Sequence, residues 1–431
     1  MKRNLIYELE QWKNLSQGRL PLVLYGARQV GKTYLLQDFA EEYYKNSVYV
    51  NFERMPVVAD IFSGDLSPER IVAYLERFFG TEIIPGETLM IFDEIQACER
   101  ALTSLKYFAE EAPEYHVAAA GSLLGVAVNR EKYSFPVGKV IMKTLYPFGF
   151  DEFLEAVGKG HFVALIREHG ETFSPMPEET HKELLEWYRM YLYIGGMPAA
   201  IRDYVDHGTL NNIPEIQNMI LNSYLADMSK YADNNESAKI RGAFQSLPVQ
   251  LSKENKKFQY KLIRRGATAN LFGEAIDWLL MAGIVLKCNK VDRGEIPLAM
   301  FQDLSAFKLY VSDTGLLTAM MSLAPQNILN GEMSDALKGA LTENYAAQVL
   351  GTGNHLLCYW ESDGRSEVDF VIQKEGKIIP VEVKYHVNTK SKSLGVFMKR
   401  FGCEYGIRLS GKNFGIENQI KSLPLYAAFL I

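Results

Sequence analysis

The octapeptide GARQVGKT, residues 26–33, places two glycines five residues apart, directly before a lysine and a hydroxyl. Glycines let the backbone turn so tightly that successive N–H groups point into one concave space, where they can bind phosphate oxygens. Lys32 would bring a positive charge to the β and γ phosphates of a nucleotide, and the Thr33 hydroxyl is a suitable Mg²⁺ ligand. The spacing therefore predicts a phosphate-binding loop.

Such a loop needs a strand before it and a helix after it. Residues 20–25 (LPLVLY) form a short apolar run, as expected of a buried parallel strand, and residues 33–44 show helical spacing of apolar side chains. The helix N-terminus would then point at the phosphates. The predicted nucleotide contacts are Gly26, Ala27, Arg28, Gln29, Val30, Gly31, Lys32, Thr33 and Tyr34.

A second acidic element lies at residues 88–96 (TLMIFDEIQ), where four apolar residues precede Asp93 and Glu94. This is the Walker B pattern: Asp93, together with Thr33, would hold Mg²⁺, and Glu94 would polarise the attacking water. A strand end with two solvated acids is the alternative. The next apolar run ends in Ser122, either a contact of the γ-phosphate or the lytic water, or a simple turn serine. Lys32, Glu94 and Ser122 are the predicted catalytic residues.

A third group of chemically competent residues lies near the C-terminus. Residues 366–385 alternate around the turn KEGK and predict a β-hairpin, with Asp369 on its first strand and Glu382 and Lys384 on one face of the second. Glu343 lies in an upstream helical segment. Acids in this order, followed by Glu-x-Lys, form the PD-(D/E)xK arrangement, in which carboxylates bind Mg²⁺ and the lysine positions water. The alternative is a docking surface for DNA or protein.

Residues 253–265 (KENKKFQYKLIRR) carry six basic residues against one acid, interleaved with Phe258 and Tyr260. This charge is enough to neutralise several phosphates of a nucleic acid. A solvated basic face that balances acidic neighbours, or a subunit contact, is the alternative. The predicted nucleic-acid contacts are Lys256, Lys257, Lys261, Arg264 and Arg265.

The elements that position these residues predict an α/β protein with four parts. Residues 1–150 would form a doubly wound parallel sheet with its ligand at the strand C-termini. Residues 151–235 predict a helical subdomain, and residues 236–325 resemble a winged helix in which a strand pair follows the helix of Trp278. Residues 326–431 would form the nuclease-like domain.

Composition limits the choice of partners. The 431-residue chain has a formal net charge of −6, so contact with nucleic acid must come from a local patch. The four cysteines share no ligand-like spacing, which fits a reducing cytosol. No signal-peptide core and no apolar stretch long enough to span a bilayer is visible, so we expect a cytoplasmic protein without membrane association.

Seven short segments of the sequence, spread over nearly the whole chain, resemble prokaryotic AAA+-like P-loop ATPases. Those proteins carry a C-terminal domain of unknown function with a restriction-endonuclease-like fold. The matching phrases are LVLYGARQVGKTYLL, MIFDEIQ, AAAGSLLG, LYPFGFDEFL, YLYIGGMPAAI, YVSDTGLL and EVDFVI. One position departs from the family pattern. The family usually has Gly-Arg before the LYPF phrase, and here Lys139 takes the place of that arginine. Lysine keeps the charge but lacks the planar guanidinium group, which argues against an arginine-finger role at this position. Arg28, Arg130 or an arginine from a second subunit remain as alternatives.

The resemblance and the motifs favour a protein that binds ATP and Mg²⁺ and hydrolyses ATP. Its nucleotide state would control a winged helix and a nuclease-like domain that act on DNA or RNA. The alternative is an ATP-driven switch that binds protein partners and has a catalytically silent C-terminal domain. An oligomer is compatible with both hypotheses. A P-loop kinase is disfavoured, because Glu94 beside Asp93 favours water as the nucleophile.

Overall fold

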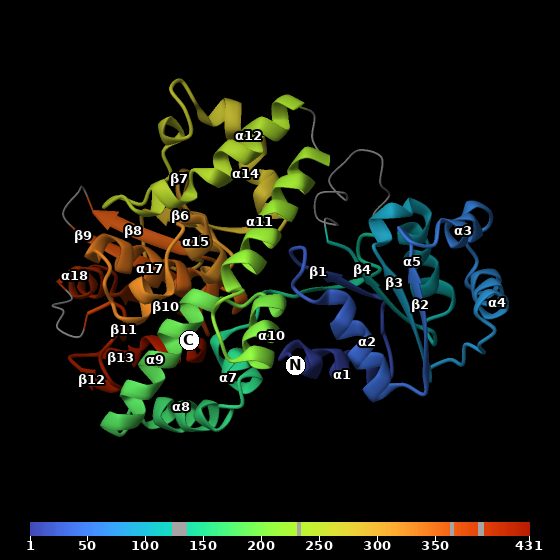
Figure 1. Cartoon of the computed structure of the whole chain (residues 1–431), viewed down its shortest axis with the longest axis horizontal. Coiled ribbons are helices and arrows are strands. Elements are labelled where there is room, and N and C mark those ends of the chain that lie inside the picture. Colours follow the sequence, from blue (N-terminus) through green and yellow to red (C-terminus); the bar gives the residue numbers. More distant parts are fainter. Residues whose placement is uncertain (123–135, 231–233, 363–365, 387–391) are drawn as a thin grey trace. The chain divides into compact units, whose positions relative to one another are not determined.

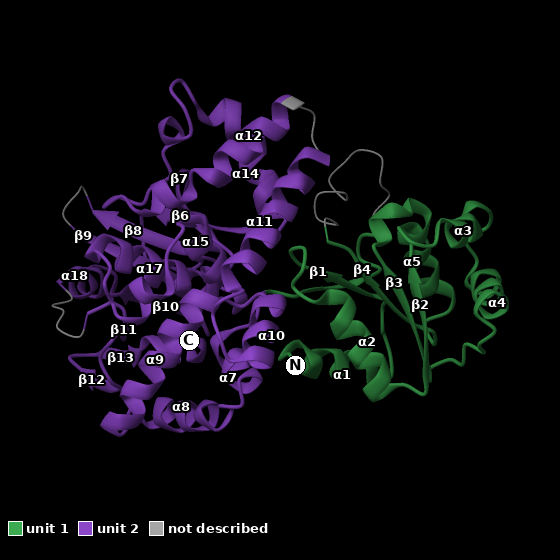
Figure 2. Ribbon diagram, viewed as in Figure 1, with its two compact units in different colours: residues 1–146 green, residues 147–431 purple. Residues whose placement is uncertain are grey.

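The computed structural model describes residues 1–122, 136–230, 234–362, 366–386 and 392–431. These residues form two compact units, residues 1–146 and residues 147–431 (Figure 2). We call them unit 1 and unit 2.

Unit 1 contains a five-stranded parallel sheet with the strand order β2-β3-β4-β1-β5 (Figure 1). This confirms the predicted parallel sheet. Its strands are β1 (Leu22–Tyr25), β2 (Asn46–Asn51), β3 (Thr88–Asp93), β4 (His116–Ala120) and β5 (Ile141–Thr144). Every residue of β3 and β4 is buried, as a parallel sheet with two covered faces requires.

Helices cover both faces of this sheet. One face presents Val48, Met90 and Phe92 to a core that α4 and α5 complete, while α2 buries its apolar side chains on the other face. Among its described residues, unit 1 has the helices α1 (Leu5–Lys13), α2 (Lys32–Tyr43), α3 (Pro56–Ala59), α4 (Pro68–Phe79) and α5 (Glu99–Glu111).

The loop between β1 and α2 packs against the backbone that follows β5. The Leu145 N–H donates a hydrogen bond to the Tyr25 carbonyl oxygen at 2.8 Å. A Cβ atom built on Gly26, where φ is 141°, would lie 2.1 Å from the Leu145 carbonyl oxygen. This contact would be far inside van der Waals distance, so only glycine fits at this position.

Unit 2 contains a mixed eight-stranded sheet with the order β12-β13-β11-β10-β9-β8-β6-β7 (Figure 1). Its strands are β6 (Val285–Val291), β7 (Gln302–Val311), β8 (Cys358–Ser362), β9 (Ser366–Lys374), β10 (Lys377–Val383), β11 (Gly406–Ser410), β12 (Gly415–Glu417) and β13 (Ile420–Pro424). Strands β9 and β10 pair antiparallel, which confirms the predicted hairpin.

The strand pair expected in a winged helix, β6 and β7, is not a separate hairpin. Strand β6 pairs in parallel with β8, with Asn289 opposite Cys358 and Lys290 opposite Tyr359. The sheet therefore crosses the boundary predicted between residues 325 and 326. The apolar pattern shows each strand correctly, but the pairing joins segments far apart in the sequence, and a local pattern carries no information about that.

A helical region precedes and surrounds this sheet. The helices of unit 2 are α7 (Phe150–Ala156), α8 (His161–Thr172), α9 (Glu178–Ile194), α10 (Pro198–His207), α11 (Ile213–Lys230), α12 (Asn234–Gln245), α13 (Leu247–Leu251), α14 (Ala269–Met281), α15 (Thr314–Met320), α16 (Pro325–Leu329), α17 (Asp335–Thr352) and α18 (Lys392–Phe401). In the described ranges of the chain, no helix combines the length and the apolar character that a membrane crossing requires.

Two segments of unit 2 meet at the fully buried Asp313. Its carboxylate accepts hydrogen bonds from the Gly196 N–H at 2.6 Å and from the Leu316 N–H at 2.9 Å, at the start of α15. Burial raises the pKa of Asp313 to about 6, although these N–H groups act in the opposite direction. A Cβ atom on Gly196 would lie 2.3 Å from the Phe148 carbonyl oxygen. The phrases LYPFGF, IGGMP and SDTG thus share one structural role, the close packing of backbone.

His116, the first residue of β4, is buried, and its Nδ1 lies 2.7 Å from the Tyr44 hydroxyl. Burial, with smaller contributions from Arg19 and Lys13, lowers the pKa of His116 from 6.5 to about 4. Because the unfolded chain takes up the proton at a higher pH than the folded chain, stability present above pH 6.5 is lost as the pH falls towards 4.

We therefore expect unit 1 to lose about 1 kcal/mol of stability per pH unit below pH 6.5, somewhat less than the full linkage slope because solvent screens part of the charge. Hydrogen exchange of β4 peptides, corrected for intrinsic rates, should show weaker protection at pH 5 than at pH 7. The difference should shrink in His116→Gln, which keeps a partner for Tyr44. An unchanged pH dependence in that variant would contradict the assignment to His116.

We expect Gly26→Ala to destabilise unit 1 by more than about 2 kcal/mol, because the added methyl group meets a backbone oxygen. Gly80→Ala is the matched control: Gly80 also has a positive φ, 63°, but no atom lies within 4 Å of its Cβ position. That variant should cost only about 1 kcal/mol. Thermal unfolding compares the two, and equal losses would show that the contact with Leu145 is unimportant.

Candidate functional site

The predicted phosphate-binding loop connects β1 to α2. Three of its residues have left-handed backbone conformations: Gly26, Gln29 with φ 67° and Gly31 with φ 94°. No side-chain hydrogen bond caps the N-terminus of α2. The first N–H groups of the helix therefore remain for an anionic ligand, which the positive end of the helix dipole would also attract.

The side chains of this loop differ in what they can contact. Ala27 and Val30 are buried in the core, so they offer a ligand only their backbone groups. Tyr34 is 55% exposed on the first turn of α2. Arg28 is partly buried and Gln29 is exposed. The backbone, with Lys32 and Thr33, is therefore what the loop offers to phosphates.

Lys32 is buried, and its ammonium group lies on the loop itself. The Nζ atom donates hydrogen bonds to the carbonyl oxygens of Gly26 and Ala27, both at 2.9 Å. Burial lowers the pKa of Lys32 to about 8, while Glu94 and Asp93 act in the opposite direction. Phosphate oxygens would be stronger partners for this cation than neutral carbonyl groups.

Asp93, at the end of β3, lies beside the start of α2. Its Oδ2 accepts hydrogen bonds from the Thr33 hydroxyl at 2.9 Å and from the Tyr49 hydroxyl at 2.7 Å, and Asn51 Nδ2 lies at 3.4 Å. Burial raises the pKa of Tyr49 to about 12. The carboxylate of Asp93 and the hydroxyl of Thr33 form an oxygen donor pair that suits a hydrated Mg²⁺ ion.

Sequence reasoning missed Tyr49 and Asn51. Both lie on β2, where Asn51 is opposite Asp93 and Tyr49 opposite Ile91. The alternation of SVYVNFE places these two polar residues on one face of the strand, which was the available signal. What the sequence does not show is that β2 is the neighbour of β3.

Glu94 has a left-handed backbone conformation, with φ 49°. Its Oε2 accepts a hydrogen bond from Gln96 Nε2 at 2.6 Å, and the Ser122 hydroxyl lies at 3.4 Å from the same oxygen. The structure thus brings together Glu94 and Ser122, two residues that the sequence places in catalysis, and adds Gln96 as a partner that the sequence did not suggest.

The residues considered for an arginine-finger role lie in different places. Lys139 forms an ion pair with Glu110 at 3.0 Å, so its charge is directed to α5. Arg28 lies in the phosphate loop. Arg130 lies outside the described residues.

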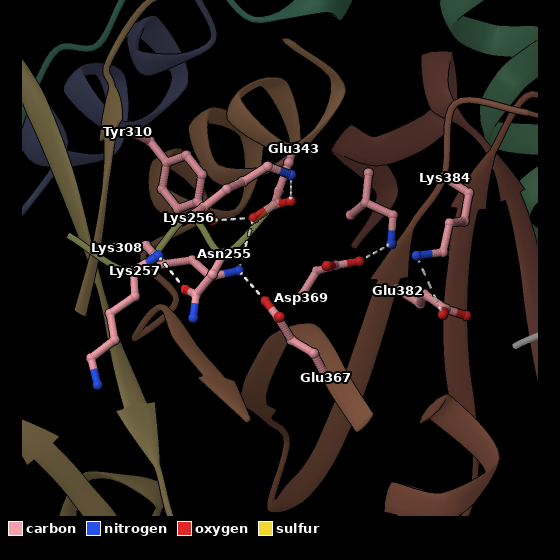
Figure 3. Close-up of polar contacts among 11 residues, drawn as sticks. Asn255, Lys256, Lys257, Lys308, Tyr310, Glu343, Glu367, Asp369, Glu382 and Lys384 are labelled. Atoms are coloured by element: carbon pink, nitrogen blue, oxygen red, sulfur yellow. Dashed lines mark hydrogen bonds and ion pairs between the residues drawn. The ribbon is translucent and has the colours of Figure 1, made fainter. Parts of the chain in front are cut away.

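Unit 2 contains a cavity of ≈ 570 Å³ that seven carboxylates and two lysines line. Glu343 on α17, Asp369 on β9, Glu382 on β10 and Lys384 just after β10 all line it, so the four residues of the predicted nuclease-like site come together (Figure 3). Asp369 Oδ2 accepts a hydrogen bond from the Val383 N–H at 2.8 Å, and Lys384 Nζ lies 3.6 Å from Glu382 Oε1.

Glu343 is held by cations that the nuclease-like motif does not include. Lys256 contacts its Oε2, while Lys308 Nζ at 3.0 Å and the Tyr310 hydroxyl at 2.6 Å donate to its Oε1 (Figure 3). Lys308 also forms an ion pair with Glu367 at 2.6 Å. A single lysine within the apolar strand AFKLYV was the available signal for Lys308, since lysine is rarely buried unless it is paired.

The charged groups in this cavity shift the pKa values of their neighbours. Burial alone would raise the pKa of Glu343, but Lys256 and Lys308 outweigh it and hold that pKa well below its usual range. Burial, followed by the charge of Glu343, raises the pKa of Asp369 to about 6. In the described part of the chain, no group of three or more His, Cys, Asp or Glu side chains is arranged to hold a metal ion.

The basic segment, residues 253–265, divides between two surroundings. The aromatic residue Phe258 packs inside the fold and does not point into solvent. Its ring stacks on that of Phe307 with centroids 5.4 Å apart, and its N–H donates to the Phe307 carbonyl oxygen. Lys256 faces the acidic cavity. Lys257 is partly buried, and the exposed predicted contacts are Lys261, Arg264 and Arg265.

Similarity to known families covers most of the chain. Residues 18–154 match the family described as AAA domain. Residues 185–327 and 338–428 match two families described as domains of unknown function, DUF8612 and DUF4143. No curated protein matches the chain.

Three solved structures align with much of the chain at low sequence identity. A Walker-type ATPase of Pyrococcus abyssi is 15% identical, with 74% of this chain and 95% of that chain covered and a TM-score of 0.46. The ORC2 protein of Aeropyrum pernix is 14% identical, with 77% and 95% covered and a TM-score of 0.39. The ORC1 protein of the same organism, in complex with DNA, is 13% identical, with 77% and 95% covered and a TM-score of 0.31. By its family matches, the chain carries an AAA-type P-loop ATPase domain followed by two domains of unknown function.

Proposed function

We propose that the chain is a Mg²⁺-dependent ATPase whose nucleotide state controls the C-terminal unit. The observation that carries this proposal is the 2.9 Å hydrogen bond from the Thr33 hydroxyl to Asp93 Oδ2. It places both oxygen donors for the metal beside the N-terminus of α2, where the phosphates of ATP would bind.

Each residue of the site then has a defined task. Backbone N–H groups of the loop bind the phosphates, and Lys32 exchanges two carbonyl oxygens for phosphate oxygens. Thr33 and Asp93 would hold Mg²⁺, and the bound ion would supply positive charge for the phosphates. Glu94 accepts a proton from the water that attacks the γ-phosphorus, and Ser122 orients that water.

Control of unit 2 is supported by the path of the chain out of unit 1. The buried Arg3 donates hydrogen bonds to the Val30 carbonyl oxygen at 3.0 Å and to the Tyr146 carbonyl oxygen at 2.6 Å. Arg3 thus joins the phosphate loop to the last residue of unit 1. A change in the loop on nucleotide binding or hydrolysis would be passed to the segment that leads into unit 2.

In the leading form of the proposal, unit 2 acts on nucleic acid. Residues 236–325 would supply a winged-helix-like binding region, with Lys261, Arg264 and Arg265 exposed for phosphate contacts. Residues 326–431 would supply a PD-(D/E)xK-like site, in which Asp369 and Glu382 would hold a divalent metal ion and Lys384 would position water.

A second function, an ATP-driven switch that binds a protein partner, is favoured by one observation. Glu343, which the nuclease-like arrangement needs as a free carboxylate, is paired with Lys256 and Lys308. A carboxylate with two ammonium partners has little charge left for a metal ion. In this form of the proposal the acidic cavity takes no part in catalysis, and unit 2 serves binding alone.

We expect Glu94→Gln to lower the ATP turnover number by roughly 10²- to 10⁴-fold, because the attacking water loses its base. ATP binding should persist, since the proposed role of Glu94 is to act on the attacking water and not to hold the phosphates. Lys32→Ala should lose both turnover and tight binding. Steady-state hydrolysis with Mg²⁺, together with a fluorescent nucleotide titration, separates the effects. Turnover that survives in Lys32→Ala would show that the site is wrongly assigned.

We expect single- or double-stranded DNA to raise ATP turnover, with a stimulation that declines steeply as salt rises, because phosphate contacts release counterions. Replacing Lys261, Arg264 and Arg265 together by glutamate should remove the stimulation and leave basal turnover unchanged. Turnover that depends on Lys32 but is indifferent to DNA and RNA would favour the protein-binding switch.

A further inference from the structure

We infer that Lys256 is an internal counter-ion that occupies the acidic cavity of unit 2 in place of a divalent cation. The inference rests on the proposed role of Asp369 and Glu382 as metal ligands. It goes further by identifying the residue that decides whether the cavity accepts a metal ion.

The side chains that line the cavity carry more negative than positive charge. Its lining holds seven carboxylates against two lysines. Glu382 is 4% exposed, and its Oε2 atom has no hydrogen-bond partner. A buried carboxylate oxygen without a partner is costly, so this wall of the cavity favours a cation.

Lys256 reaches this cavity from outside the hairpin and the helix that form it. It lies in the segment between α13 and the short 3₁₀ helix at Tyr260–Leu262, and its ammonium group contacts Glu343 Oε2. The side chain of Lys256 is 15% exposed and that of Glu343 is 6% exposed. The pair is therefore well shielded, and its mutual attraction is much stronger than that of a surface ion pair.

Two contacts fix this segment on the fold. Phe258 stacks on Phe307 of β7, as described above, and Gln250 exchanges hydrogen bonds with the backbone of Gln259 at 2.9 and 3.0 Å. These contacts fix Phe258 and Gln259, two and three residues after Lys256, and so keep Lys256 at the cavity as part of the folded structure.

Lys308 and Lys256 play different parts in neutralising Glu343. Lys308 is 1% exposed and donates to both Glu343 and Glu367, so it belongs to the core of the sheet. Lys256 lines the cavity itself and also acts electrostatically on Asp369, after the larger contributions of Lys384 and Lys308. A divalent ion entering beside Asp369 and Glu382 would meet the charge of Lys256, which lowers its affinity. Removing that one charge should therefore raise the affinity of this site for a divalent ion.

The test is Mn²⁺ binding by the full-length, nucleotide-free protein, measured by the electron paramagnetic resonance signal of free Mn²⁺. Lys256→Met should bind one Mn²⁺ ion at least about tenfold more tightly than the wild type, because a nearby like charge is gone. Lys257→Met is the matched control, since it removes the same charge from the neighbouring residue, and it should behave as the wild type. Asp369→Asn in the Lys256→Met background should remove this gain in Mn²⁺ affinity.

Lys256→Gln gives a second variant if Lys256→Met fails to fold, because glutamine keeps a hydrogen bond to Glu343 without the charge. Tighter Mn²⁺ binding in either variant, dependent on Asp369, supports the inference. Wild-type binding as tight as that of the variant overturns the inference and leaves the metal-site proposal intact. No binding in any of these proteins overturns both.

Discussion

The close approach of the Leu145 carbonyl to Gly26 is the constraint on which unit 1 depends. Strand β1 lies between β4 and β5, so the backbone that leaves β5 must pass directly over the first residue of the phosphate loop. That passage shapes the loop, and Arg3 ties its far side to Tyr146. The geometry that would cradle phosphates and the exit towards unit 2 are therefore parts of one packed arrangement.

Unit 2 relies on buried charges in a comparable way. Asp313 satisfies backbone N–H groups of two segments, and Lys308 of β7 links Glu343 of α17 with Glu367 of β9. Buried ion pairs contribute little net stability, because desolvation offsets much of their attraction. Breaking one partner is nevertheless costly, so such groups select a single packing of the segments they join. Catalysis need not explain their presence.

How far the sequence predicts the structure depends on the distance between the interacting residues. The phosphate loop, the acidic strand end at Asp93 and the β9–β10 hairpin are local patterns, and the structure contains each of them. The pairing of β6 with β8 and the contact of Lys256 with Glu343 join residues more than 60 positions apart. Charge composition showed that residues 253–265 are basic. It could not show that one of these lysines faces carboxylates of the same chain.

The pairing of β6 with β8 also has a consequence for synthesis of the chain. Strands β6 and β7 leave the ribosome first and can form their antiparallel pair at once. One edge of β6 then stays open until α15, α16 and α17 have been made and β8 appears. An open edge exposes unpaired backbone groups that invite pairing with other chains. A nascent or truncated chain that stops before β8 would therefore be the species most prone to aggregate, and the helices made in that interval are the parts of the molecule available to shield it.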